Sequence, residues 1–493
     1  MNTAVAALAA ALLAIPQAAP PTGAAGQTPP TPASGVAPPR PQVHSPPSPL
    51  PHPVIGKDSV TSQPPPGPPA TNESLAQWGN EVGALLLKKD TDGIAERFAP
   101  SLVAVLPPWR FGQGWGGIED RNGKIRSVGD PVVKGSGKDA VVVLPLQMER
   151  TELKALVAFN NLGKITSIRF APSAGPAIPP AVEWRAPAYV NPKKFRDVDV
   201  RIGYAPWVLV GALSLPAGKG PFPAVVLVHG SGPNDQDETV GGVKPFRDLA
   251  WGLASQGVAV LRYEKRTRTY GEKMAKLPVT VKEEVLDDAV AAIDFLRDNV
   301  AIDKGRIVVL GHSLGGQLAP RIAEVAKGKV AGVVVMAGPT RPLPDIVEDQ
   351  AAYLVANGAA NEEAVAPLRA DAKKIREIDP AKPPEGLILN APAAYWIDLA
   401  AYDPVATARK NALPILILQG DRDYMVTAKD LEGWKKGLAG APFARFETFP
   451  EANHLFVNGQ GKSLPSEYQM AGNVGAKVVD AIAEWVKGLP VRK

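Results

Sequence analysis

The chain has 493 residues, of which 45% are apolar and 21% charged, values that are ordinary for a soluble globular protein. This length exceeds one compact core, so two domains and some non-globular sequence are expected. The net charge of +5 is spread thinly, without a run of five Lys or Arg residues, which disfavours nucleic-acid binding. Because the chain has no cysteine, disulfides, thiolate metal sites and a cysteine nucleophile are excluded.

The first 70 residues are expected to lie outside any folded domain. An apolar run from Ala4 to Ile15, followed by small residues, is too short to span a bilayer and predicts a signal peptide at residues 1–19. An Ala-rich disordered start is the alternative. Residues 20–71 predict a Pro-rich disordered linker, because 19 of the 52 prolines lie in the first 70 residues and favour polyproline II. We therefore expect an exported protein, periplasmic or secreted, with no integral membrane span in the mature chain.

Residues 72–172 predict a small α+β domain. Thr71 or Asn72 is placed to cap a helix whose apolar residues recur at helical spacing. Turn signals separate the segments that follow. The runs expected to form strands lie at 102–106, 140–146, 153–159 and 165–170. No residue of this domain has a pattern typical of catalysis.

From residue 180 to residue 490, short apolar strands alternate with amphipathic helices. This alternation predicts an α/β fold, with a mostly parallel sheet covered by helices on both faces. Right-handed crossovers bring the C-terminal ends of the parallel strands to one edge, where ligands bind. The strands are expected at 197–202, 207–215, 224–228, 258–263, 307–310, 330–336, 414–418 and 444–449.

An insertion at residues 341–404 is expected to form a helical cap. It holds four large apolar side chains: Tyr353, Tyr395, Trp396 and Leu399. They could cover an acyl pocket as a mobile lid, or they could simply pack helices together, and the sequence favours neither reading.

The strongest motif is Gly311-His312-Ser313-Leu314-Gly315, between an expected strand and an expected helix. In a G-x-S-x-G turn the serine hydroxyl is raised above the sheet, and glycines two residues away on either side avoid a collision. The same turn directs the backbone N–H of Leu314 at a developing oxyanion. We predict that Ser313 is a catalytic nucleophile.

A serine nucleophile needs a base, and the chain has five histidines. His44 and His52 lie in the Pro-rich linker. His312 neighbours the serine on its own turn and cannot swing back to the hydroxyl, while His229 ends a strand inside another motif. His454, after the last expected strand, is therefore the predicted base.

The acid of the triad should lie between the serine and the base along the chain. Two carboxylates, Asp421 and Asp423, follow the strand expected at 414–418. Asp421 comes directly after Gly420, where its side chain is placed to cap the turn or to pair with Arg422. Asp423 lies deeper in the loop and can reach the base, so it is the predicted acid, with Asp421 as the alternative.

A second oxyanion donor is expected in the loop after strand 224–228, which reads His-Gly-Ser-Gly-Pro-Asn at 229–234. Its glycines allow the backbone N–H of Ser231, or of Gly232, to point at the substrate oxygen. A plain Gly-rich turn is the alternative.

These motifs resemble those of bacterial α/β-hydrolase esterases, and the resemblance covers residues 190–490. It includes Tyr-Glu-Lys-Arg at 263–266, where relatives carry Asp in place of Glu264, and Tyr-Asp-Pro at 402–404. The resemblance implies an α/β-hydrolase fold and a carboxylic-ester hydrolase, although thioesterases, acyltransferases and prolyl-peptidase-like enzymes are relatives too. Residues 72–172 resemble a small domain of unknown function that often precedes such hydrolases.

Two glycine-rich segments do not qualify as nucleotide sites. Residues 112–117 satisfy G-x-G-x-x-G, but a hairpin turn is expected after them instead of a helix. Residues 135–138 fail as a phosphate loop, because Val132 and Asp139 stand where that motif needs Gly and Ser or Thr. No His, Asp or Glu cluster has metal-ligand spacing, so neither metal nor cofactor is expected.

The sequence thus predicts a serine carboxylesterase that acts on a small-molecule ester through an acyl-enzyme intermediate. A serine peptidase or an acyltransferase of the same fold is the alternative among enzymes. Outside that class, the alternative is a protein that binds an envelope component through residues 72–172.

Overall fold

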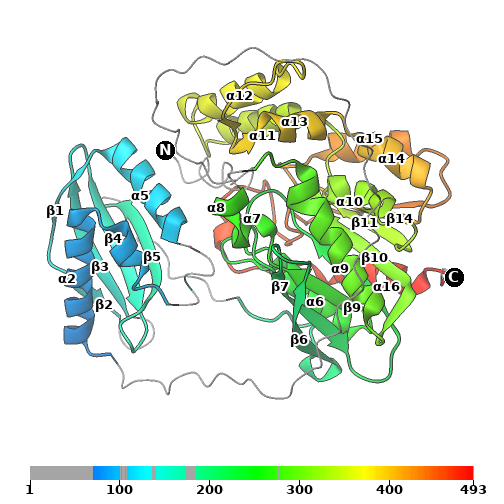
Figure 1. Cartoon of the computed structure of the whole chain (residues 1–493), viewed down its shortest axis with the longest axis horizontal. Coiled ribbons are helices and arrows are strands. Elements are labelled where there is room, and N and C mark those ends of the chain that lie inside the picture. Colours follow the sequence, from blue (N-terminus) through cyan, green and yellow to red (C-terminus); the bar gives the residue numbers. More distant parts are fainter. Residues whose placement is uncertain are drawn as a thin grey trace, which may run out of the picture. The chain divides into compact units, whose positions relative to one another are not determined.

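The computed structural model describes residues 70–99, 102, 106, 108–135, 140–173, 184–274 and 277–491. They form two units, and the chain divides between them at residues 177 and 178 (Figure 1). The signal peptide expected at 1–19 and nearly all of the expected linker lie outside the described residues. Within the described part, no helix combines the length and the apolar character needed to cross a membrane.

The first unit contains a five-stranded antiparallel sheet in the order β1-β3-β4-β5, with β2 also paired to β3. Helix α2 begins as its sequence predicts, because Thr71 Oγ1 accepts the N–H of Ser74 in a capping box. This helix packs against β1, β2 and β3. The bounds are α2 (Asn72–Lys88), α3 (Thr91–Ala95), α5 (Pro108–Asn122), β1 (Ile125–Val128), β2 (Val132–Lys134), β3 (Val141–Met148), β4 (Glu152–Phe159) and β5 (Ile165–Pro172).

Two expectations for this unit are wrong. Where a strand was expected at 102–106, Leu102 is helical, and the N–H of Leu106 donates to the carbonyl of Leu102 at 2.7 Å. A short apolar run does not by itself distinguish a strand from a buried helical turn. The expected hairpin turn after residues 112–117 is instead the end of α5, which contains the whole glycine-rich segment. Phe111 and Trp115, four residues apart and both buried, give that helix its apolar face.

The second unit is built on an eight-stranded sheet in the order β15-β14-β11-β10-β8-β9-β7-β6. The six strands from β15 to β9 pair in parallel, while β7 is antiparallel to both of its neighbours. The prediction of a mostly parallel sheet is therefore confirmed. The bounds are β6 (Phe195–Ile202), β7 (Leu209–Pro216), β8 (Phe222–Val228), β9 (Ala259–Tyr263), β10 (Ile302–His312), β11 (Gly332–Met336), β14 (Ile415–Gly420) and β15 (Ala444–Phe449).

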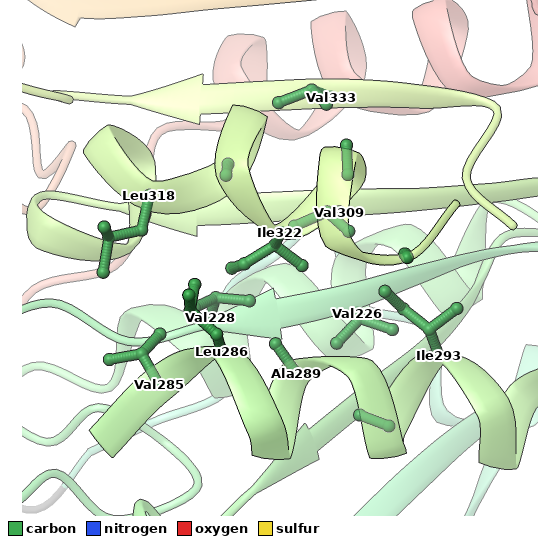
Figure 2. Packing of buried hydrophobic residues seen from close by; sticks show 14 of the residues in the cluster. Val226, Val228, Val285, Leu286, Ala289, Ile293, Val309, Leu318, Ile322 and Val333 are labelled. Carbon is green, nitrogen blue, oxygen red and sulfur yellow. The ribbon is translucent and has the colours of Figure 1, made fainter. Parts of the chain in front are cut away.

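Helices cover both faces of this sheet, as predicted. Alternate side chains of β8 enter different cores, with Val226 and Val228 in one cluster and Val225 and Leu227 in the other. Figure 2 shows the first cluster, in which β8 and β10 meet helices α9 and α10. The second cluster includes α6 and α16. The helices are α6 (Pro245–Ser255), α9 (Asp287–Asp298), α10 (Leu314–Val325), α15 (Ala428–Gly437) and α16 (Ala476–Gly488).

Short helical segments follow β9 and lead into α9. A π-helical turn precedes α9, so the helical stretch from Lys282 to Asp298 is not one regular α-helix. The segments are α7 (Arg266–Thr269), α8 (Gly271–Met274) and the π-helical η3 (Lys282–Leu286); the 3₁₀ turns η2 (Pro192–Lys194) and η4 (Glu467–Gln469) lie elsewhere in the unit.

The insertion between β11 and β14 is helical, as predicted, and Figure 1 shows its helices α11, α12 and α13 grouped beyond α10. Asp403, part of the Tyr-Asp-Pro segment, caps α14 by accepting the N–H groups of Val405 and Ala406, both at 2.9 Å. The bounds are α11 (Leu343–Ala356), α12 (Glu362–Arg376), β12 (Leu387–Ile388), β13 (Ala391–Pro392), α13 (Ala393–Ala400) and α14 (Pro404–Asn411).

Candidate active site

Ser313 stands on a sharp turn between β10 and α10, with φ 54° and ψ −118°. A positive φ is strained for a residue other than glycine, and residues with such strained backbone are often found at functional sites. The glycines on either side have no room for a side chain. A Cβ atom on Gly311 would lie 2.0 Å from the carbonyl oxygen of Gly315, and one on Gly315 would lie 2.2 Å from that of Val228. Packing thus requires glycine at both positions of the motif.

Asp423 and His454 meet at the carboxyl edge of the sheet. His454 Nδ1 lies 2.7 Å from Asp423 Oδ2, and both side chains are buried. The other carboxylate oxygen accepts the backbone N–H groups of Met425 at 2.8 Å and Val426 at 3.0 Å. Oδ2 is thus placed to accept a hydrogen bond from the Nδ1–H of His454, an arrangement that leaves Nε2 as an acceptor.

The competing carboxylate, Asp421, is exposed directly after β14. Its backbone N–H donates to the carbonyl of Phe449 at 3.1 Å and thus continues the pairing of β14 with β15. Arg422, the partner suggested for Asp421, instead forms an ion pair with Glu467 at 2.8 Å. Of the two candidates, Asp423 is the one that the structure brings to His454.

A cavity of about 40 Å³ is lined by four of the five predicted site residues, all except Asp423. Ser313, His454, Ser231 and Leu314 all line it, and the remaining lining is mostly apolar. Three of the four large cap side chains, Tyr395, Trp396 and Leu399, contribute to its wall. The fourth, Tyr353, instead stacks on Tyr424 with ring centroids 4.8 Å apart. The cap therefore supplies both cavity lining and ordinary packing.

Hydrogen bonds to the Gly230 backbone hold the loop after β8 in place. The N–H of this glycine donates to Glu238 Oε1 at 2.6 Å, and its carbonyl accepts from Lys265 Nζ at 2.8 Å. Asn234 Nδ2 also donates to this carbonyl, at 3.2 Å, and to that of Ser231, at 3.1 Å. The loop lies directly on the serine turn, because a Cβ on Gly230 would be 3.1 Å from Ser313 Cβ. The loop is thus held in place by side chains of Glu238, Asn234 and Lys265.

His312, which the sequence excludes as the base, forms a buried ion pair with Glu238, with Nδ1 3.0 Å from Oε2. Burial alone would lower the pKa of His312, but the charge and hydrogen bond of Glu238 outweigh it and raise that pKa. Burial likewise opposes ionisation of Glu238, yet the charge of His312 holds the pKa of this carboxyl below its usual value. Through Nε2, His312 also donates to the carbonyl of His454 at 2.9 Å. The pair thereby connects the loops of Gly230 and His454.

His229, the other histidine near the site, is buried, and its Nε2 lies 3.0 Å from the carbonyl of Asp235. Burial lowers its pKa to about 4, and the nearby charge of Lys265 acts in the same direction. His229 is therefore neutral near pH 7 and supports its own loop.

Sequence reasoning assigned no role in the site to three buried charged residues: Glu238, Lys265 and Glu284. Lys265 offered a signal, because it follows the buried strand β9 at the edge where the site forms. Glu284 lies among other charged residues of η3 and offered none. Across the described ranges, no group of three or more His, Asp or Glu side chains could hold a metal ion.

Comparison with known proteins gives a consistent result. A model of the alpha/beta hydrolase family matches residues 225–462. The chain is 42% identical over 342 residues to the esterase EstD of Thermotoga maritima, which covers 69% of this chain and 78% of EstD. It is 31% identical over 182 residues to acyl-coenzyme A amino acid N-acyltransferase 2 of Rattus norvegicus, 36% of each chain. A solved esterase of Pyrococcus furiosus aligns at 16% identity with a TM-score of 0.41, covering 63% of this chain and 98% of the esterase. The chain belongs to the alpha/beta hydrolase family.

Proposed function

We propose that this chain, a hydrolase of the esterase type, cleaves carboxylic esters through an acyl-enzyme intermediate. Ser313 is the nucleophile, His454 the general base and Asp423 its partner. The observation that carries the proposal is the 2.7 Å contact between His454 Nδ1 and Asp423 Oδ2, beside a cavity that Ser313 also lines. EstD, named an esterase, supports the choice of esters as the substrate class.

In the acylation step, His454 Nε2 removes the proton of the Ser313 hydroxyl as Oγ attacks the ester carbonyl. Asp423 keeps the proton on Nδ1 and stabilises the imidazolium that forms. The backbone N–H groups of Leu314 and Ser231 stabilise the negative oxygen of the tetrahedral intermediate. His454 then gives its proton to the alcohol, which leaves as the acyl group becomes bonded to Ser313.

In the second step, water takes the place of the alcohol. His454 removes a proton from this water, the hydroxide attacks the acyl carbon, and the acid is released as Ser313 regains its proton. We expect short acyl groups to be preferred, because the cavity is small and its wall includes the buried side chains of Tyr395 and Trp396.

A second candidate function is acyl transfer to an amine, which the similarity to a rat N-acyltransferase favours. It would use the same acyl-enzyme, with an amine in place of the water. The two functions differ only in the second step, so one experiment separates them.

The test is a set of p-nitrophenyl esters, from acetate to palmitate, assayed with and without glycine as acceptor, alongside peptide anilides. We expect turnover of the short esters, free acid as the product, and fluorophosphonate labelling of Ser313 by mass spectrometry. N-acylglycine as the main product would favour the transferase. Cleavage of the anilides alone, or labelling at another residue, would contradict the esterase proposal.

A further inference from the structure

The peptide bond that joins Gly230 to Ser231 is held by a buried cation. Lys265 Nζ donates to the Gly230 carbonyl at 2.8 Å, and Lys265 is 3% exposed. The backbone N–H of Lys265 in turn donates to the carbonyl of Asn234 at 3.1 Å. The lysine is therefore anchored to this loop through both its backbone and its side chain.

The orientation of this peptide fixes the direction of the Ser231 N–H. The peptide is trans, and in a planar trans peptide the carbonyl and the N–H point in opposite directions. A carbonyl held toward Lys265 therefore turns the Ser231 N–H away from Lys265. Ser231 lines the cavity with Ser313, whereas Lys265 is buried and does not line it. We therefore infer that the N–H is turned toward the cavity, where an oxyanion would form.

Lys265 is itself held by a chain of buried side chains that ends in the cap. Its ammonium lies 2.8 Å from Glu284 Oε1, and the hydroxyl of Tyr395 donates to Glu284 Oε2 at 2.7 Å. Glu284 is 2% exposed and Tyr395 1%. Tyr395 belongs to α13, and its side chain also lines the cavity.

A contribution to folding stability does not explain this series of linked buried side chains. Removing an ammonium and a carboxylate from water costs about as much as their attraction returns, and an apolar pair of the same size often serves a fold as well. A buried cation that binds one peptide carbonyl has a more specific consequence, because it sets the direction and strengthens the dipole of the neighbouring N–H.

We propose that Lys265 is a positioning residue for the Ser231 amide in the oxyanion site, and that Glu284 and Tyr395 hold it in place. This inference rests on the proposed function, in which Ser231 stabilises the oxyanion. Lys265 does not touch the substrate. Its effect is confined to the state that carries the negative oxygen, so it acts on kcat and not on the binding of the ester.

The experiment compares three variants of the full chain with the wild type on p-nitrophenyl acetate. The double variant Lys265→Met/Glu284→Gln removes both charges, so that neither ion is left buried without its partner. Lys265→Arg keeps the cation, and Tyr395→Phe keeps the aromatic ring on the cavity wall. Tyr353→Phe is the matched control, because it also loses one cap hydroxyl, which donates to Ser463 away from the cavity. The measurements are kcat, KM and the inhibition constant of a trifluoromethyl ketone, which forms an oxyanion on a serine.

For the double variant we expect kcat to fall by roughly a hundredfold, the order of one oxyanion donor, with KM changed less than threefold. The inhibition constant should rise by the same factor as kcat falls. Lys265→Arg should keep most of the wild-type kcat. In Tyr395→Phe, kcat should fall and the inhibition constant should rise by the same factor of about five, whereas Tyr353→Phe should change neither.

A double variant that melts cooperatively and keeps kcat and the inhibition constant within twofold of wild type would overturn the inference. If that variant does not fold, Tyr395→Phe decides: equality with Tyr353→Phe overturns the inference, and a parallel change in both constants supports it. Fluorophosphonate labelling of wild-type Ser313 separates this result from the proposed function. Labelled Ser313 with unaffected variants refutes only the role of Lys265, whereas unlabelled Ser313 refutes the esterase mechanism itself.

Discussion

The two loops that flank Ser313 are held in place by different means. In the loop after β14, the carboxylate of Asp423 is oriented by near neighbours, because it accepts the N–H groups of Met425 and Val426, two and three residues further along. The loop after β8 depends on side chains from distant segments, since Gly230 is bound by Glu238, eight residues away, and by Lys265, 35 residues away. The carboxylate of Asp423 is therefore oriented by its own loop, whereas the Gly230 peptide depends on a buried charge network.

This difference has a consequence for mutations. A change in the local loop should act on the chemistry of one residue and leave its neighbours in place. A change in the charge network should spread, because Glu238 and His312 connect the loops of Gly230 and His454. Substitutions in each loop, and at Ser313 between them, test this contrast.

Replacing Ser313 with alanine should have the largest effect, since both loops serve its hydroxyl. We expect turnover to fall by roughly six orders of magnitude, about 8 kcal/mol of transition-state stabilisation, if the three residues act as a unit. The measurement is kcat on a p-nitrophenyl ester, with circular dichroism to show that the fold is intact. Substantial residual turnover by a homogeneous, folded Ser313→Ala protein would contradict the assignment of the nucleophile.

Replacing Asp423 with asparagine should disturb the contact between the loop after β14 and His454. The amide keeps the shape of the carboxylate but allows the wrong tautomer of His454, so kcat should fall by about ten-thousandfold. The matched control is Asp421→Asn, in the same loop but exposed, which should cost far less. Both variants are assayed as folded proteins on the same ester. The reverse order of loss would mean that Asp421 is the acid in solution.

The triad is the part of the site that the sequence could predict. Ser313 and its glycines belong to a contiguous motif, His454 is one of five histidines, and Asp423 stands at a fixed distance beyond a strand. The sheet was predictable for a similar reason, since a strand buried on both faces reads as an unbroken apolar run. The motif and the strands depend on residues that are close together in the chain, whereas His454 follows from excluding the other four histidines.

The charge network was not predictable because its partners are far apart and its charges look like surface charges. Glu284 lies in the sequence Lys-Glu-Glu-Val-Leu, where neighbouring Glu283 is partly exposed and Glu284 buried. Only the packing of η3 decides which of the two carboxylates is enclosed. The strand wrongly expected at 102–106 has the same explanation, because a short apolar run does not show whether it packs as a strand or as a helical turn.

Replacing Glu238 with glutamine should disturb the loop after β8, which depends on the buried charge network. The amide oxygen can still accept the N–H of Gly230, but the charge that pairs with His312 is lost. Charged hydrogen bonds are about twice as strong as neutral ones, so we expect kcat to fall by roughly tenfold. Glu432→Gln on the exposed face of α15 is the matched control and should leave kcat unchanged. Equal kcat values for the two variants would show that the charge at Glu238 is dispensable.

The smallest expected effect is a pH dependence of stability, because the Glu238–His312 pair stabilises the fold only while both partners are charged. Glu238 has a pKa below its ordinary value of 4.5, so its contribution is present above about pH 4.5 and is lost as the pH falls through the lowered value. His312 has a pKa above its ordinary value of 6.5, so its contribution is complete below pH 6.5 and is lost as the pH rises through the raised value. The difference in Tm between wild type and Glu238→Gln should therefore be widest between about pH 4.5 and 6.5 and narrow on both sides. Thermal melts from about pH 4 to 9 measure it. A difference that stays constant over this range would mean that the pair stabilises the site by packing and not by charge.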